Sequence, residues 1–353
     1  MIKMLSKIAL FGREKAGRVL RHLDDFIGRS INRKIFFHDS GLWFVKRLRD
    51  KRLKDITLKE FVFPRTVQIE ISTLCNADCI GCWLQGIKRP RAIMNKMLYE
   101  KIVEESSCYN STIVLSWIGE PTLDPDLVNK IKLAKGYGIK RVELATNGSL
   151  MNERLSSGMI EAGLDGIHFS LDGLTKGTFE SIRKNLDFNI VAANIGSFIR
   201  LRNKLGSKKP RININFRRMK QNIHEWDEFR REWGPRVDSI SSWVLSENQS
   251  EYYPFSKREK YYNRRLPCFR LWERAPIYVN GLVGLCCAFA KEEIIMGDIS
   301  KQSLREIWNS DPFTKYRKLH SELRFSEAPV CNKCNLWKFP AFGYFPHDHP
   351  WYV

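Results

Sequence analysis

The sequence lacks any apolar run of the roughly 18–20 residues that a membrane-spanning helix needs. A short apolar stretch at residues 8–11 is followed at once by Arg13 and Lys15, and it is too short for the core of a secretory signal. Glycine (22) and proline (14) form no short repeat, which excludes a fibre. A hydrophobic content of 43% excludes a disordered chain. We therefore predict a folded, cytoplasmic protein.

Acidic residues are scarce relative to basic ones, with 39 Asp and Glu against 59 Lys and Arg, so that the net charge is +20. Residues 1–66 hold 17 Lys and Arg but only 7 Asp and Glu, which is half of the excess. Between residues 42 and 52, apolar and aromatic side chains alternate with basic ones. This pattern predicts a basic helical extension over residues 1–65. Its apolar side packs on the main domain or, through residues 1–60, contacts an anionic membrane surface or a phosphate-bearing partner.

Strand-like and helix-like segments alternate from about residue 66 onward. Six segments are short and rich in β-branched residues, as in strands: 67–72, 112–117, 141–145, 166–171, 211–216 and 239–244. Helical patterns lie between them: 94–105, 124–135, 152–163, 178–205 and 224–232. Such alternation indicates parallel strands with right-handed crossovers. Six units fall short of a closed eight-stranded barrel, so the sequence predicts an α/β protein with a partial (β/α)6 TIM-like barrel over residues 66–245.

Polar or cysteine-rich segments follow four of the predicted strands, where the chemistry of parallel sheets is found. A loop with three cysteines follows the first strand, and Gly119-Glu120 follows the second. Asn147 follows the third strand, and Ser170 and Asp172 close the fourth. Four segments in register predict a single site on one rim of the barrel.

The cysteine loop carries the strongest chemical signal. Cys75, Cys79 and Cys82 lie within eight residues, and three thiolates can hold three irons of a [4Fe–4S] cluster while the fourth iron stays open. A structural zinc site would need a fourth ligand nearby, and none of Asn76, Asp78 and Trp83 is a usual one, although an aspartate can serve. A disulfide framework is not expected among the nine cysteines, because no export signal is present. We therefore predict a cluster site.

The segment CNADCIGC resembles the CxxxCxxC loop of radical S-adenosylmethionine (SAM) enzymes, and the resemblance covers about residues 66–245. It implies that Cys75, Cys79 and Cys82 ligate a [4Fe–4S] cluster whose open iron is chelated by SAM. In that family, an electron from the cluster splits SAM into methionine and a 5′-deoxyadenosyl radical. The radical then abstracts a hydrogen atom from the substrate.

The resemblance assigns SAM contacts to six residues: Gly119, Glu120, Asn147, Ser170, Asp172 and Arg183. The first two end the GGE(P) motif, which holds the SAM amino group. The serine and the aspartate match a polar pair near the ribose and the carboxylate, and the asparagine lines the same cleft. The arginine is expected to pair with the SAM carboxylate. Two positions depart from the family pattern, because Ile118 replaces the first glycine of GGE and Gly81 replaces an aromatic residue.

A second cysteine set, in the C-terminal part of the chain, comprises Cys268, Cys286, Cys331 and Cys334. Four thiolates can close a structural zinc site or a fully ligated iron–sulfur cluster, and their spacing alone does not choose between the two. Behind a radical SAM core, the pattern resembles a SPASM/twitch extension over residues 246–336, which carries an auxiliary [4Fe–4S] cluster. Four cysteines rather than seven favour the one-cluster twitch form, as in the dehydrogenase type that acts on 2-deoxy-scyllo-inosamine.

Two further C-terminal features carry predictions. Cys287, next to the expected ligand Cys286, is either a small buried residue or a thiol that returns a hydrogen atom to a substrate radical. Residues 337–353 are rich in aromatic side chains, and we predict a tail that packs across the barrel or covers its mouth.

Together these features predict a radical SAM oxidoreductase that abstracts hydrogen from a polar, sugar-like or cyclitol-like substrate, with the auxiliary cluster as electron acceptor. The net charge of +20 favours an anionic or phosphate-bearing substrate. An electron donor such as flavodoxin or ferredoxin is expected. An epimerase and a peptide-modifying enzyme are alternatives. A zinc-containing nucleic-acid-binding protein is the alternative of another class, although the open-ligand cysteine loop argues against a nucleic-acid partner.

Overall fold

The computed structural model describes residues 62–244, 265, 267–287 and 294–334. The predicted basic extension therefore lies outside the described residues except at its end, and the predicted aromatic tail lies wholly outside them. The proposed membrane contact through residues 1–60 also falls there. Among the described helices, none combines the length and the apolar character that crossing a membrane would require.

Six parallel strands form the predicted barrel wall, in the order in which they follow along the chain. They are β1 (Thr66–Ile69), β3 (Thr112–Val114), β4 (Arg141–Thr146), β5 (Gly166–Ser170), β7 (Arg211–Arg218) and β8 (Ser239–Val244). Each begins within about two residues of its predicted position, and the predicted partial (β/α)6 barrel is confirmed. The β-branched, alternating sequences explain why these segments are extended.

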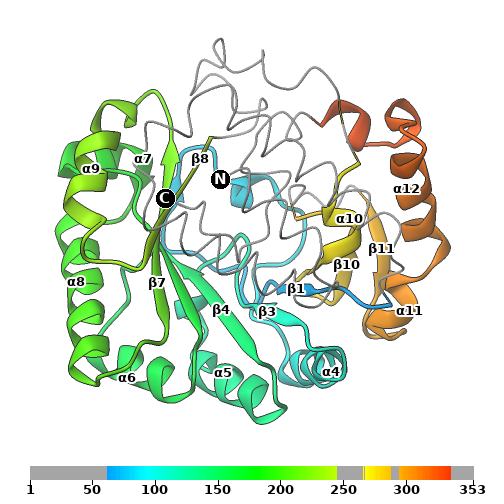
Figure 1. Ribbon diagram of the computed structural model, residues 1–353, viewed down its shortest axis with the longest axis horizontal. Helices are drawn as coiled ribbons and strands as arrows, with labels where there is room; N and C mark the ends of the chain where they lie inside the picture. Colours follow the sequence, from blue (N-terminus) through cyan, green and yellow to red (C-terminus); the bar gives the residue numbers. More distant parts are fainter. Residues whose placement is uncertain (1–61, 245–264, 266, 288–293, 335–353) are drawn as a thin grey trace, which may run out of the picture.

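Helices follow the strands and cover the outer face of the sheet (Figure 1). They are α4 (Lys96–Ser107), α5 (Leu127–Gly136), α6 (Glu153–Glu161), α7 (Lys176–Ile182), α8 (Phe188–Lys204) and α9 (Trp226–Trp233). Side-chain caps begin several of them, as where Asn152 accepts from the N–H of Leu155 at 2.9 Å. The 3-10 turns η1 (Trp83–Gly86), η2 (Pro121–Leu123) and η3 (Ile223–Glu225) lie in the connections.

One predicted helix begins later than expected. The helix predicted from residue 124 begins at Leu127, because η2 precedes it and the Asp124 carboxylate accepts from the N–H of Asp126 at 2.9 Å. The helical segments predicted over residues 178–205 are α7 and α8, which β6 (Arg183–Lys184) separates. That short strand pairs antiparallel with β2 (Asp78–Cys79), which holds the middle cysteine of the loop.

Alternation along the strands separates two faces of the sheet. On β7, Ile212, Ile214 and Phe216 are fully buried and belong to the main apolar core, which packs beneath the helices. The residues between them, Asn213 and Asn215, therefore point to the inner face of the barrel. The apolar core lies outside the barrel wall, and the inner face is left for polar groups.

The C-terminal segment continues the same sheet, which the sequence did not predict. β9 (Arg274–Ile277) pairs parallel with β1, and β10 (Leu282–Gly284) and β11 (Ile295–Asp298) add antiparallel strands to give nine in the described part of the sheet. The helices α10 (Arg270–Glu273), α11 (Leu304–Trp308) and α12 (Asp311–Ser321) pack beside them, with the 3-10 turns η6 (Phe325–Glu327) and η7 (Cys331–Lys333) (Figure 1). The C-terminal cysteines are thereby anchored to the barrel wall.

Candidate active site

The three cysteines of the first loop lie just beyond β1, at the carboxyl end of the barrel strands. Pairing of β2 with β6 sets Cys79 opposite Arg183. The pKa of Cys75 is raised to about 11, chiefly by burial and in smaller part by the charges of Glu120, Cys79 and Cys82. Cys79 and Cys82 therefore lie close enough to Cys75 for their charges to affect its pKa. Gly81, in the same loop, has a φ of 64°, which glycine adopts without strain and an aromatic residue rarely does.

Arg183 links the cysteine loop to the end of β5. Its Nη1 lies 3.8 Å from Cys79 Sγ, and its Nη2 lies 2.7 Å from Asp172 Oδ2. Burial alone would lower the pKa of Arg183, but the charges of Asp172 and Cys79 outweigh it and raise the pKa. The backbone N–H of Arg217 donates to Asp172 Oδ1 at 2.6 Å. Asp172 therefore holds Arg183 and Arg217 beside the Cys79 thiol. Both oxygens of its carboxylate already have hydrogen-bond partners.

The Gly119-Glu120 pair closes tightly on the cysteine loop. A Cβ at Gly119 would lie 2.1 Å from the carbonyl oxygen of Ser72, so no side chain fits there. Glu120 is only 2% exposed. It accepts from the hydroxyls of Thr122 and Thr146 at 2.6 and 2.7 Å and from the N–H of Asn147 at 2.7 Å. Glu120 thus ties the ends of β3 and β4 together.

Asparagine side chains connect the cysteine loop to the end of β4. Asn147 Nδ2 donates to Asn76 Oδ1 at 2.9 Å, and Asn76 Nδ2 donates to Ser149 Oγ at 2.8 Å. Ser170 lies half-buried at the end of β5. The structure therefore brings the predicted SAM contacts and the three cysteines to one rim of the barrel. This rim lies at the carboxyl ends of the parallel strands, where barrel enzymes carry their active sites.

The four C-terminal cysteines also come together, from three separate segments. Cys268 precedes α10, Cys286 follows β10, and Cys331 and Cys334 lie in and directly after η7. The pKa of Cys268 is raised to about 11 and that of Cys331 to about 12, chiefly by burial and in part by the charges of other thiols of the set. The thiols therefore lie within electrostatic range of one another.

Backbone contacts hold this second set in place. The N–H of Cys268 donates to Nδ1 of the fully buried His320 at 3.1 Å. Arg265 Nη2 donates to the carbonyl oxygen of Cys331 at 2.7 Å. Beside the set, Cys287 accepts a hydrogen bond from Arg270 at its sulfur. A hydrogen bond from Cys286, and then the Arg270 charge, lower the pKa of Cys287 despite its burial.

Two family models match the chain over the regions that hold these two sites. Residues 69–202 match the radical SAM superfamily, and residues 268–335 match the SPASM iron–sulfur cluster-binding domain. The chain contains a radical SAM domain followed by a SPASM domain. As a radical SAM protein it binds a [4Fe–4S] cluster and SAM, and its SPASM domain binds iron–sulfur in addition.

Curated relatives of this radical SAM protein have several activities. A tungsten-containing aldehyde ferredoxin oxidoreductase cofactor-modifying protein from Pyrococcus furiosus is 24% identical, over 76% of this chain and 86% of its own length. A probable GTP 3′,8-cyclase from Methanothermobacter thermautotrophicus is 28% identical, over 50% of this chain and 56% of its own length. This range leaves the substrate open.

Solved structures of low sequence identity share the fold. BtrN in complex with AdoMet and 2-DOIA is 19% identical with a TM-score of 0.51, and the match covers 77% of this chain and 93% of BtrN. Streptococcus suis SuiB bound to the precursor peptide SuiA is 17% identical with a TM-score of 0.60, and the match covers 84% of this chain and 75% of SuiB.

The residues of both sites fit the clusters that a radical SAM protein of this kind binds. Each site gathers three or four thiols, which are the usual iron–sulfur ligands. Within the residues that the structure describes, no three His, Cys, Asp or Glu side chains converge closely enough for a single metal ion. A [4Fe–4S] cluster distributes its thiolates over separate irons, so its ligands do not need to converge on a single point.

Several residues at these sites were not predicted. Arg217 lies near the carboxyl end of β7, the fifth barrel strand, at the same rim. Its place at the end of a predicted strand is the signal that indicates it. Asn76 lies inside the cysteine motif itself, where the cysteines are the stronger signal. Arg270 and His320 carry no local signal, because long-range packing alone brings them to the C-terminal cysteines.

Proposed function

We propose that this radical SAM protein oxidises a polar small molecule of the sugar or cyclitol kind by two electrons. Cys75, Cys79 and Cys82 would hold the cluster that, with SAM, supplies a hydrogen-abstracting radical, and Cys268, Cys286, Cys331 and Cys334 would hold the electron-accepting cluster. For a carbinol substrate, one hydrogen atom leaves carbon, one electron goes to the acceptor, and one proton goes to a base, so that a ketone forms.

The observation that carries this proposal is the polar inner face of the barrel. Closed barrels of this type fill their interior with branched apolar side chains. Here Asn213 Nδ2 donates to Asn215 Oδ1 at 2.7 Å, and Ser241 Oγ donates to Asn213 Oδ1 at 2.9 Å. On other strands, Gln68 and His168 occupy the inner positions. A wall of amides, hydroxyls and an imidazole suits a substrate that offers hydroxyl or amino groups.

Charge at the rim supports an anionic group on the substrate or cofactor. Arg183 and Arg217 both lie against Asp172, at 2.7 and 3.3 Å, so two guanidinium groups share one carboxylate. Arg183 also faces Cys79, so a carboxylate or phosphate would bind at Arg217, in agreement with the net charge of +20.

The test is to incubate anaerobically purified protein with SAM, a reductant and pooled polar metabolites, and to follow products by mass spectrometry. We expect a product two mass units lighter than its substrate, formed in equal amount with 5′-deoxyadenosine. Cys79→Ser should abolish both, whereas Cys108→Ser, an exposed cysteine at the end of α4, should leave both unchanged. Deuterium uptake from solvent without oxidation would instead establish an epimerase. Turnover only with a precursor peptide would establish a peptide-modifying enzyme.

A further inference from the structure

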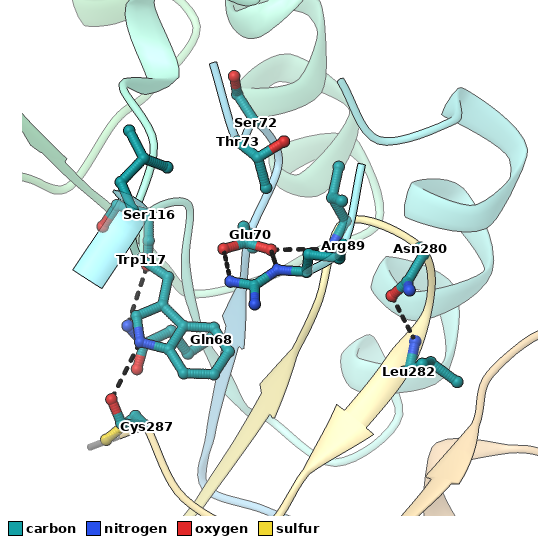
Figure 2. Close-up of polar contacts among 12 residues, drawn as sticks. Gln68, Glu70, Ser72, Thr73, Arg89, Ser116, Trp117, Asn280, Leu282 and Cys287 are labelled. Atoms are coloured by element: carbon teal, nitrogen blue, oxygen red, sulfur yellow. Dashed lines mark hydrogen bonds and ion pairs between the residues drawn. The ribbon is translucent and has the colours of Figure 1, made fainter. Parts of the chain in front are cut away.

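Trp117 forms a direct hydrogen bond between the barrel rim and the loop of the C-terminal cysteines. Its indole Nε1–H donates to the carbonyl oxygen of Cys287 at 3.0 Å, across 170 positions of sequence (Figure 2). Trp117 stands two residues before Gly119, on the segment that leads from β3 into the Gly119-Glu120 loop. Cys287 directly follows Cys286. One side chain therefore joins the segments that carry the two cofactor sites.

The indole ring is held in a fixed orientation. It stacks on the buried ring of Tyr278, with centroids 4.8 Å apart and planes inclined by 7°. The guanidinium of Arg89 lies 4.5 Å from the centroid of Tyr278 and 5.7 Å from that of Trp117. Next to the tryptophan, Gln68 Nε2 donates to the carbonyl oxygen of Ser116 at 3.0 Å. The backbone and the ring of Trp117 are both restrained.

Arg89 connects this stack to the cysteine loop of the barrel. It lies seven residues after Cys82, and its side chain pairs with Glu70 on the segment after β1, with Nε 2.6 Å from Oε2 (Figure 2). Both charged groups are completely buried. Glu70 Oε2 also accepts from the N–H of Val279, next to Tyr278, at 3.1 Å. A buried pair with good geometry fixes the relative position of the elements that carry it.

We propose that Trp117 is a positioning residue for the auxiliary cluster, because its hydrogen bond to Cys287 fixes the Cys286 loop against the rim that carries the Gly119-Glu120 loop. This rests on the proposed function only in assigning Cys286 to a cluster. Groups next to a metal ligand orient it and tune the metal centre. The hydrogen bond sets the path of the Cys286 loop, and hence the environment of the cluster that it helps to hold.

The experiment compares Trp117→Phe with Trp117→His. Phenylalanine keeps a ring for the stack but removes the N–H donor. Histidine loses ring area but can place Nε2–H at the same ring position as the indole N–H. Both are made in a Cys75→Ala, Cys79→Ala, Cys82→Ala background, so that only the auxiliary cluster contributes to the EPR spectrum. Trp226→Phe is the matched control, because the altered ring packs against Phe216 of β7 and Phe229 of α9 and not against either cysteine set.

We expect Trp117→Phe to shift the midpoint potential and change the g-values of the auxiliary cluster, with Trp117→His restoring both toward the parent and Trp226→Phe leaving them unchanged. Loss of auxiliary iron in Trp117→Phe alone, with thermal unfolding unchanged, would support the same role. Identical spectra and potentials in Phe and parent proteins would overturn the inference, as would equal changes in the Phe and His variants. Zinc in place of iron in the parent protein would contradict the proposed function, whereas unchanged spectra and potentials contradict the role of Trp117. The two failures are therefore distinguishable.

Discussion

Single residues set how tightly the active-site rim closes. Gly119 lies so near the backbone of Ser72 and Leu74 that a Cβ would fall 2.1 Å from one carbonyl oxygen and 2.9 Å from the other. Both neighbours are backbone atoms and cannot move aside as a flexible side chain would. The glycine of the GGE-like motif is therefore explained by contact distance alone, independently of any cofactor.

Gly119→Ala should destabilise the cofactor-free protein by about 1–3 kcal/mol or more, because overpacking forces the backbone to shift. Gly177→Ala is the control, since a Cβ at Gly177 in α7 would meet no other atom within 4 Å, and helix propensity should make that change neutral or slightly stabilising. Urea unfolding monitored by circular dichroism measures both. Equal stability of Gly119→Ala and the parent would contradict the close contact.

At the scale of elements, the connections at the two ends of the strands have different tasks. The carboxyl-end loops carry the cysteines, amides and arginines of the site, whereas an ion-pair network away from the site joins loops at the opposite end. Before β5, Asp165 accepts from Lys135 at 2.8 Å, from Lys209 at 2.6 Å and from the N–H of Val142 at 2.9 Å. Burial raises its pKa, but the two lysines outweigh burial and lower it. This carboxylate joins three connections.

Asp165→Asn should lower the free energy of unfolding at pH 7 by about 1–3 kcal/mol, the typical value for a charged hydrogen bond. Because the folded pKa of Asp165 lies below its unfolded value of about 3.9, the stabilisation is present above that pH and is lost as pH falls through the folded pKa. The difference between variant and parent should therefore narrow below about pH 4.

The control for this pH dependence is Asp227→Asn. Asp227 lies exposed on α9, with Arg230 at 3.9 Å, so its stability difference from the parent should be small at every pH. Denaturant unfolding between pH 7 and pH 2 gives both curves. An Asp165→Asn difference that stays constant down to pH 2 would show that the ion pairs do not stabilise the fold.

On the scale of the whole molecule, one sheet carries both cysteine sets. β9 pairs with β1 over four residues, so the C-terminal strands extend the barrel wall. The buried pair of Glu70 and Arg89 lies where the two parts meet. The two cysteine sets therefore lie on one continuous sheet, which fixes their relative position.

The whole chain, purified without oxygen, should contain about eight irons with matching sulfide, as two [4Fe–4S] clusters require. Cys268→Ser combined with Cys331→Ser should leave about four irons, because only the first cysteine loop then stays complete. Cys108→Ser should keep the full content. Metal and sulfide analysis measures these values, and four irons with one zinc in the parent would show that the C-terminal site is structural.

Much of this architecture follows from the sequence alone. The β-branched segments predicted all six barrel strands, because strand formation depends on local pattern and on burial of alternate residues. The spacing of Cys75, Cys79 and Cys82 indicated the cluster loop. Asn147 and Asp172 were expected at the same rim because each follows or ends a predicted parallel strand. Resemblance to the radical SAM family then supplied the cofactors, which two matching domain models support.

Only the tertiary structure decided how these residues act on one another. Arg183 contacts Asp172 and Cys79, Glu120 accepts hydrogen bonds from η2 and from the end of β4, and Trp117 reaches Cys287 across 170 positions. The pairing of β9 with β1 is equally remote in sequence. Local propensity and spacing act over a few residues, whereas these contacts depend on how whole elements pack. The sequence by itself determined the chemistry of the two sites, and the packing determined their arrangement.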